Sequence, residues 1–142
     1  MKLRTTTEEE SKLLLSLGID SATSDSWWSH GAYVNNGTPL LIRTRDKRIS
    51  QINLCDDDIP AWSLNALLNL LPENIKISGN DNNYERRMIM CGTKITIFYE
   101  ESVIRDWVES YLMPSKRVYE VSGNDLFSVI FEVIKKLYTD KL

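Results

Sequence analysis

The segment from Ser122 to Tyr138 constrains the fold of this chain more than any other part of the sequence. Its polar residues recur at helical spacing and form one narrow stripe, made of Ser128, Glu132, Lys135, Lys136 and Thr139. Nearly all the other side chains are apolar, and Ser122 is the expected N-cap with Asp125 at the third helical position. An apolar arc of that width must be buried against more than one neighbour. We therefore expect Phe131 to be buried, with the N-terminal helix as its favoured cover over a twofold-related subunit.

Two further helices are predicted from their boundary signals. Thr5, Thr6 and Thr7 each stand three residues before a Glu, so each can start a capping box, and Gly18 is well placed to end a helix over about residues 7–17. Pro60 and Pro72 bracket a second candidate, 61–71, because proline is tolerated in a first helical turn. Its apolar positions fall on one face, namely Ala61, Leu64, Leu67, Leu68 and Leu71.

Short β-type runs occupy much of the remaining chain. Strands are expected over 40–42, 49–54, 75–77, 85–91, 94–100 and 117–121, with a tight reversal at Gly92 and Thr93. Residues 20–37 are typical of an extended loop, and 102–112 fit either a helix stripe or a strand, with a lean to helix. The predicted class is α+β: one domain over 1–142, with an antiparallel sheet of about five strands and three or four helices packed on it.

Composition excludes several classes of protein. The 142 residues are 42% apolar and 26% charged, which is typical of a globular domain and not of a disordered or fibrous chain. The net charge of −3 argues against a protein that binds nucleic acid through bulk charge. No secretion signal or membrane-spanning run is present, so we expect a cytoplasmic protein that does not use a membrane. Cys55 and Cys91 are expected to be reduced, unpaired and buried.

Three segments of the chain resemble a known family. The most distinctive is Asp57 to Pro72, with the run Pro60-Ala61-Trp62-Ser63-Leu64; the others are Leu17 to Trp28 and the stretch from Ser122 onward. They are similar to a family of small uncharacterised proteins from Bacteroides-type bacteria, often encoded on prophages and other mobile elements. Residues 102–116 depart from that pattern. The resemblance implies a mobile-element context and no catalytic residues, because the family has no established activity.

Each candidate for catalysis or metal binding has a simpler structural explanation. His30 is the single histidine and lies in the predicted loop, which leaves a catalytic triad or a His-based metal site without further members. Asp56, Asp57 and Asp58 precede a predicted helix, where acidic residues meet the positive end of the helix dipole. We therefore predict no catalytic residues, no metal site and no cofactor. A metal-dependent hydrolase around the aspartates is the weakest of the alternatives.

Two features remain as candidate binding residues. Trp27 and Trp28 are consecutive, so in an extended segment they cannot both point inward, although both can still pack over the edge of the core. The basic stretch with Arg43, Arg45 and Arg48 resembles a phosphate-binding patch, but Asp46 interrupts it and no aromatic residue interleaves with it.

The predicted function is that of a small accessory protein of mobile-element type, which acts by binding an unknown protein partner without catalysis, as a monomer or a homodimer. The alternative is a nucleic-acid-associated factor that uses the basic stretch Arg43–Arg48.

Overall fold

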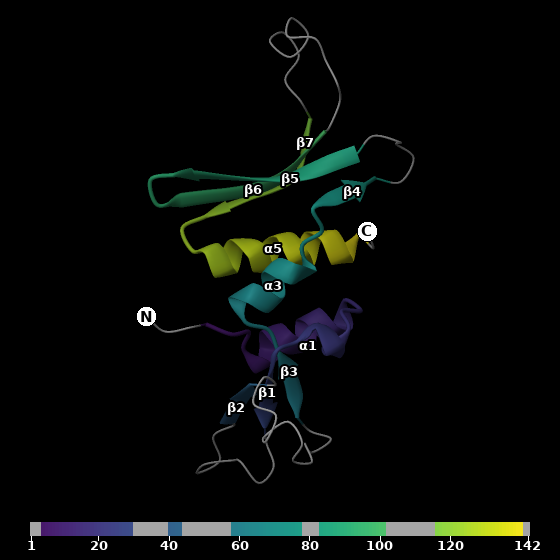
Figure 1. Cartoon of the computed structure of the whole chain (residues 1–142), viewed down its shortest axis with the longest axis vertical. Coiled ribbons are helices and arrows are strands. Elements are labelled where there is room, and N and C mark those ends of the chain that lie inside the picture. Colours follow the sequence, from purple (N-terminus) through teal and green to yellow (C-terminus); the bar gives the residue numbers. More distant parts are fainter. Residues whose placement is uncertain (1–3, 30–39, 44–57, 78–82, 102–115, 141–142) are drawn as a thin grey trace, which may run out of the picture. The chain divides into compact units, whose positions relative to one another are not determined.

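The computed structural model describes residues 4–29, 40–43, 58–77, 83–101 and 116–140 (Figure 1). The chain divides into two compact units, Met1–Leu70 and Leu71–Leu142. The described parts contain α-helices and two antiparallel sheets, of three and four strands, so the α+β class is confirmed. The strands are divided between two sheets, however, where the sequence predicted a single sheet of about five. One domain over 1–142 stays a prediction.

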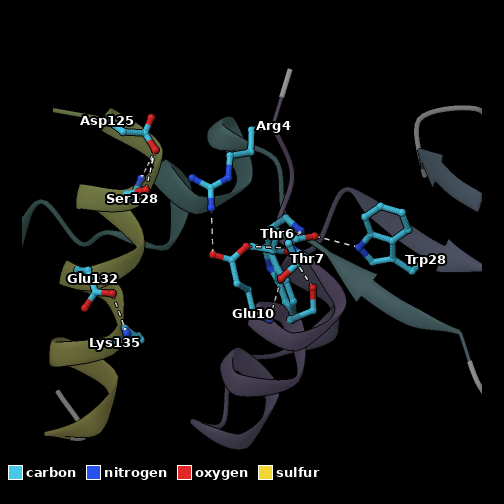
Figure 2. A network of polar contacts seen from close by, with 11 residues as sticks. Arg4, Thr6, Thr7, Glu10, Trp28, Asp125, Ser128, Glu132 and Lys135 are labelled. Atoms are coloured by element: carbon cyan, nitrogen blue, oxygen red, sulfur yellow. Dashed lines mark hydrogen bonds and ion pairs between the residues drawn. The ribbon is translucent and has the colours of Figure 1, made fainter. Parts of the chain in front are cut away.

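The first unit begins with α1 (Glu8–Ser16), which lies within one residue of the predicted 7–17 at each end. Thr7 is the N-cap of a complete capping box: the Glu10 N–H donates to Thr7 Oγ1 at 3.2 Å, and the Thr7 N–H donates to Glu10 Oε1 at 2.9 Å (Figure 2). Gly18 follows the helix at φ +90°, a conformation that glycine adopts without a steric penalty, and the Ile19 N–H donates back to the Leu14 carbonyl. The local sequence therefore defines both ends of α1.

The sheet of the first unit has the order β2-β1-β3. It consists of β1 (Ser26–Ser29), β2 (Leu40–Arg43) and β3 (Ile59–Ala61), and a short 3-10 helix, η1 (Ser21–Thr23), precedes it. The prediction of a loop over 20–37 was therefore wrong at β1. The prediction that Pro60 opens a helix was also wrong, because Pro60 lies in β3. This strand is at the sheet edge, where a missing N–H is tolerated.

The helix after β3 is α3 (Leu64–Leu70), which is shorter than the predicted 61–71. It starts later because Ala61 still pairs with Ser26 in the sheet and because Ser63 caps the helix, with its Oγ 3.3 Å from the Ala66 N–H. Leu67 is fully buried, as predicted.

The second unit contains the sheet β4-β5-β6-β7. Its strands are β4 (Asn74–Lys76), β5 (Asn83–Cys91), β6 (Lys94–Glu101) and β7 (Arg117–Gly123), close to the predicted ranges. Gly92, at φ +62°, and Thr93 form the predicted two-residue reversal between β5 and β6, with Cys91 opposite Lys94. Three side chains of β6 lie buried on one face of the sheet, namely Ile95, Ile97 and Tyr99.

The C-terminal helix α5 (Leu126–Thr139) packs against β6 and β7 (Figure 1). Its N-cap is Asp125, whose carboxylate accepts from the Ser128 N–H at 3.3 Å. The prediction of Ser122 as the cap was wrong, because Ser122 is still in β7 and its hydroxyl lies 2.8 Å from that of Thr96. Phe131 is buried, as predicted, with 6% of its surface exposed. The identity of its cover stays a prediction.

Other predictions fall on residues that the structure does not describe. These are the strand over 49–54 and the helix or strand over 102–112. Within the described ranges, no helix has both the length and the apolar character needed to cross a bilayer.

Candidate functional site

Trp27 and Trp28 lie in the middle of β1 and point to opposite faces of its sheet. Trp28 shares a face with the buried Ser26, and its Nε1–H donates to the Thr6 carbonyl at 2.9 Å (Figure 2). Trp27 lies between Ile42 of β2 and Pro60 of β3 in the pairing register. Both indoles are half-buried. Trp28 therefore has a structural contact, and Trp27 stays the predicted contact residue of the two.

A buried polar network surrounds Trp62. The Trp62 N–H donates to Thr6 Oγ1 at 3.0 Å, and the Thr6 N–H donates to the Trp62 carbonyl at 2.9 Å. The Thr6 hydroxyl also lies 2.7 Å from the hydroxyl of Ser11 in α1, while the indole N–H of Trp62 donates to Thr23 Oγ1 at 2.9 Å. Thr6, Ser11 and Trp62 are fully buried. These hydrogen bonds tie α1, η1 and the start of α3 together.

Asp25 and Ser63 form a second polar contact in this unit. The Ser63 N–H donates to Asp25 Oδ1 at 3.0 Å, and the Ser63 hydroxyl donates to Asp25 Oδ2. The Asp25 N–H in turn donates to the Ala61 carbonyl at 3.3 Å. Because Ser63 also caps α3, the contact between Asp25 and Ser63 stabilises the start of this helix. The contact also joins two of the three segments from which the sequence predicts a family resemblance.

The predicted aspartate and histidine candidates are only partly described. His30, Asp56 and Asp57 lie outside the described residues, and Asp58 is half-buried just before β3. In the described parts of the chain, no group of three His, Cys, Asp or Glu side chains is arranged to hold a metal ion.

The basic residues divide between described and undescribed segments. Arg43 is the last residue of β2 and lies opposite Ser26, whereas Arg45 and Arg48 lie outside the described residues. Arg86 and Arg87 belong to the second unit. Arg86 donates to the Leu71 carbonyl at 3.0 Å, and the Arg87 guanidinium lies 2.7 Å from the Glu85 carboxylate and 3.8 Å from that of Glu100. Both of these arginines therefore have contacts within their own unit.

Two tyrosines of the second unit have strongly shifted pKa values. Burial raises the pKa of Tyr99 to about 12, and its hydroxyl donates to the Pro72 carbonyl at 2.7 Å. Burial, followed by the hydrogen bond to the Asp140 carboxylate, raises the pKa of Tyr119 to about 12. Their rings meet edge to face at 6.5 Å. Both hydroxyls remain protonated at neutral pH and act as hydrogen-bond donors within the fold.

Among the described residues of the second unit, the most exposed apolar surface is one that the sequence did not reveal. Met88, Ile89 and Met90 follow one another in β5 and are 45%, 44% and 67% exposed. Cys91 next to them is also exposed and unpaired, so the prediction that it is buried was wrong. The reason is the length of β4, which pairs only with Asn83–Glu85. We call residues 87–91 the open edge of β5, because β6 pairs with them on one side and no described strand pairs with them on the other.

Two sequence signals indicate the open edge in retrospect. One is the contrast between a long strand and a much shorter neighbour. The other is the uninterrupted apolar run from Met88 to Cys91, which is typical of a strand covered on both faces and so calls for a cover that the described strands do not supply.

Comparison of the chain with protein-family models, with curated proteins and with solved structures finds no match.

Proposed function

We propose that this protein is a small cytoplasmic accessory protein, of the kind that mobile elements encode, and that it acts by binding another protein without catalysis. The observation that supports this proposal is the open edge of β5. It combines three consecutive exposed apolar side chains with a strand edge that lacks a described neighbour. Exposed apolar patches of this kind mark interaction sites in soluble proteins.

The chemistry of a strand edge suits a protein partner. Backbone N–H and C=O groups along the edge bind an added strand, and the side chains on the two faces select which strand is accepted. Met88 and Met90 lie on one face of β5, and Ile89 lies on the other. Methionine adapts its shape to irregular apolar surfaces, which favours contact with another protein. Trp27 in the first unit is a second predicted contact residue.

The test is affinity capture from the native host with three forms of the tagged chain. The variant Met88→Thr/Met90→Thr keeps the strand propensity of β5 and removes two of its three exposed apolar side chains. The control Leu13→Gln/Leu15→Gln removes two side chains of α1 with comparable exposure, 39% and 37%. We expect a partner that binds the wild type and the α1 control and is lost with the β5 variant.

Two results would overturn this proposal. The first is a partner that binds all three forms equally, since the open edge would then have no part in the interaction. The second is retention on heparin at low salt that disappears when Arg43, Arg45 and Arg48 are replaced by Ser. That result would favour the nucleic-acid-associated alternative.

A further inference from the structure

We propose that the partner of the open edge is a second copy of this chain. In this arrangement β5 of each copy pairs antiparallel with β5 of the other about a twofold axis at Ile89. The two four-stranded sheets then form one continuous sheet. This inference rests on the proposed function, because it identifies the partner of the same surface.

The direction of the backbone groups along β5 supports this pairing. The Arg86 N–H donates to the Glu73 carbonyl at 2.9 Å, so the backbone groups of Arg86 face the side of β5 on which β4 lies. In an antiparallel ladder, successive residues direct their N–H and C=O groups to alternate sides. Met88 and Met90 therefore direct theirs to the same side as Arg86, beyond the end of β4. These are the backbone groups of the open edge that face a potential partner strand.

One register satisfies these groups in both copies. With Ile89 opposite itself, Met88 of each copy lies opposite Met90 of the other, and each such pair exchanges both N–H···O bonds. If Met88 lay opposite itself, Met90 would lie opposite Arg86, whose N–H already binds Glu73. If Met90 lay opposite itself, Met88 would lie opposite Gly92 in the turn. The register centred on Ile89 is the one that uses the whole open edge.

The side chains are compatible with that register. Ile89 packs against its own counterpart on one face, and the methionines pack together on the other. Arg87 lies opposite the neutral Cys91, so the pairing places no like charges directly opposite each other. In this register only the turn residue Gly92 comes opposite Arg86, at the position where β4 of the second copy begins.

The two edges of this sheet differ in their protection. β7 carries Arg117 and Glu120, and its pairing with β6 is interrupted by an irregularity between Ile97 and Tyr99, with Tyr119 in the left-handed region at φ 54°. Charges and bulges of this kind prevent edge-to-edge pairing. Within the open edge of β5, Arg87 is the only charged residue. Its guanidinium is engaged by Glu85 and Glu100 of its own sheet. The edge that lacks these protective features is the one we expect to pair.

The register is tested by disulfide trapping in the full chain with Cys55→Ser and Cys91→Ser. Ile89→Cys places two thiols opposite each other at a site without direct hydrogen bonds, where the Cα atoms are ~4.5 Å apart and a disulfide can form. Thr96→Cys is the matched control, because Thr96 lies beside Ile89 on the same face but one strand further from the edge. Under mild oxidation we expect a covalent dimer from Ile89→Cys and about tenfold less from Thr96→Cys. Equal trapping of both, or none at position 89, would overturn the register.

Dimerisation itself is measured by sedimentation equilibrium. A short edge-to-edge interface buries less surface than the ~1,200 Å² that stable complexes bury. We therefore expect a weak dimer with a dissociation constant of about 100 µM. Ile89→Lys should raise the dissociation constant of the dimer at least about tenfold, because two lysines would face each other at the axis. Thr96→Lys should leave the dissociation constant unchanged. Met90→Pro gives a second measurement, because it removes an outward N–H at an edge position that tolerates proline. Circular dichroism confirms that each variant is folded.

Two outcomes separate this inference from the proposed function. A chain that stays monomeric up to about 1 mM would overturn the pairing of two copies. If that monomer still lost its host partner on Met88→Thr/Met90→Thr substitution, the proposed function would stand. A dimer that Ile89→Lys and Met90→Pro leave unchanged would also overturn the pairing, because it would use another surface.

Discussion

Replacing Asp25 with Ala should destabilise the first unit by about 2–3 kcal/mol. The Asp25 carboxylate accepts from both the backbone N–H and the hydroxyl of Ser63 at the start of α3. Hydrogen bonds to charged groups contribute about 1.5–3 kcal/mol each, and the lower part of this range applies because Asp25 is half-buried. The substitution also leaves the first turn of α3 without part of its cap.

The assay is urea unfolding followed by tryptophan fluorescence, since Trp27, Trp28 and Trp62 all lie in the first unit. Asp20→Ala is the control. It removes an exposed carboxylate that caps the short helix η1 through the Ala22 N–H, and it should cost no more than about 1 kcal/mol.

A double-mutant cycle with Ser63→Ala isolates the interaction between the two side chains. The free energies of unfolding should be non-additive by about 1 kcal/mol or more, because both substitutions remove the same hydrogen bond. The assigned role of this contact would be refuted if the two changes in the free energy of unfolding were additive. It would also be refuted if Asp25→Ala lowered the free energy of unfolding no more than Asp20→Ala does.

Three further substitutions test the packing of the two units. Leu67→Ala should cost about 2–5 kcal/mol, because Leu67 is fully buried, whereas Asn69→Ala on the exposed side of the same helix should change stability little in urea unfolding. Gly123→Ala should cost about 1–3 kcal/mol by thermal unfolding, because an added Cβ would lie 2.9 Å from Val129 Cγ2 and force α5 away from β7. Burial raises the pKa of Tyr99 from the ordinary value of about 10 to about 12, so between these pH values the folded state binds more protons than the unfolded state. The free energy of unfolding should therefore fall as the pH rises from about 10 to about 12. Tyr99→Phe should reduce this loss in unfolding curves recorded across that pH range.

Elements defined by local signals could be predicted from the sequence. The capping box at Thr7 and Glu10, the glycine at φ +90° after α1 and the two-residue turn at Gly92 all depend on residues within a few positions of one another. The apolar arc of α5 likewise identified a helix with a buried Phe131. In each case the chemistry that determines the structure lies inside the segment itself.

Elements that depend on distant partners could not be predicted. β1 lies in a region rich in Ser and Asp, and it is a strand because β2 and β3 pair with it on both sides. Pro60 looks like a helix start until its strand is known to be at a sheet edge. The true start of α3 depends on Asp25, which lies 38 residues before Ser63. These assignments needed the pairing of segments far apart in the sequence.

The candidate site was predicted only in part, for a related reason. Consecutive tryptophans indicated that Trp27 and Trp28 face opposite ways, but not that Thr6 binds the second of them. The run from Met88 to Cys91 was correctly predicted to be a strand. Its exposure depends on how far β4 extends along β5, and the sequence of β5 does not contain that information.

Two of the three segments from which the sequence predicts a family resemblance, Leu17 to Trp28 and Asp57 to Pro72, contact each other in the first unit. Thr23 and Asp25 from one segment bind Trp62 and Ser63 from another, so the distinctive residues hold the fold together. Proteins that share these segments would therefore share a scaffold without necessarily sharing a partner. The open edge of β5 lies outside all three segments and contributes no described contact to that network. If the proposed function holds, residues such as Ile89 can differ between proteins that share this scaffold, and the partner of each protein then differs with them.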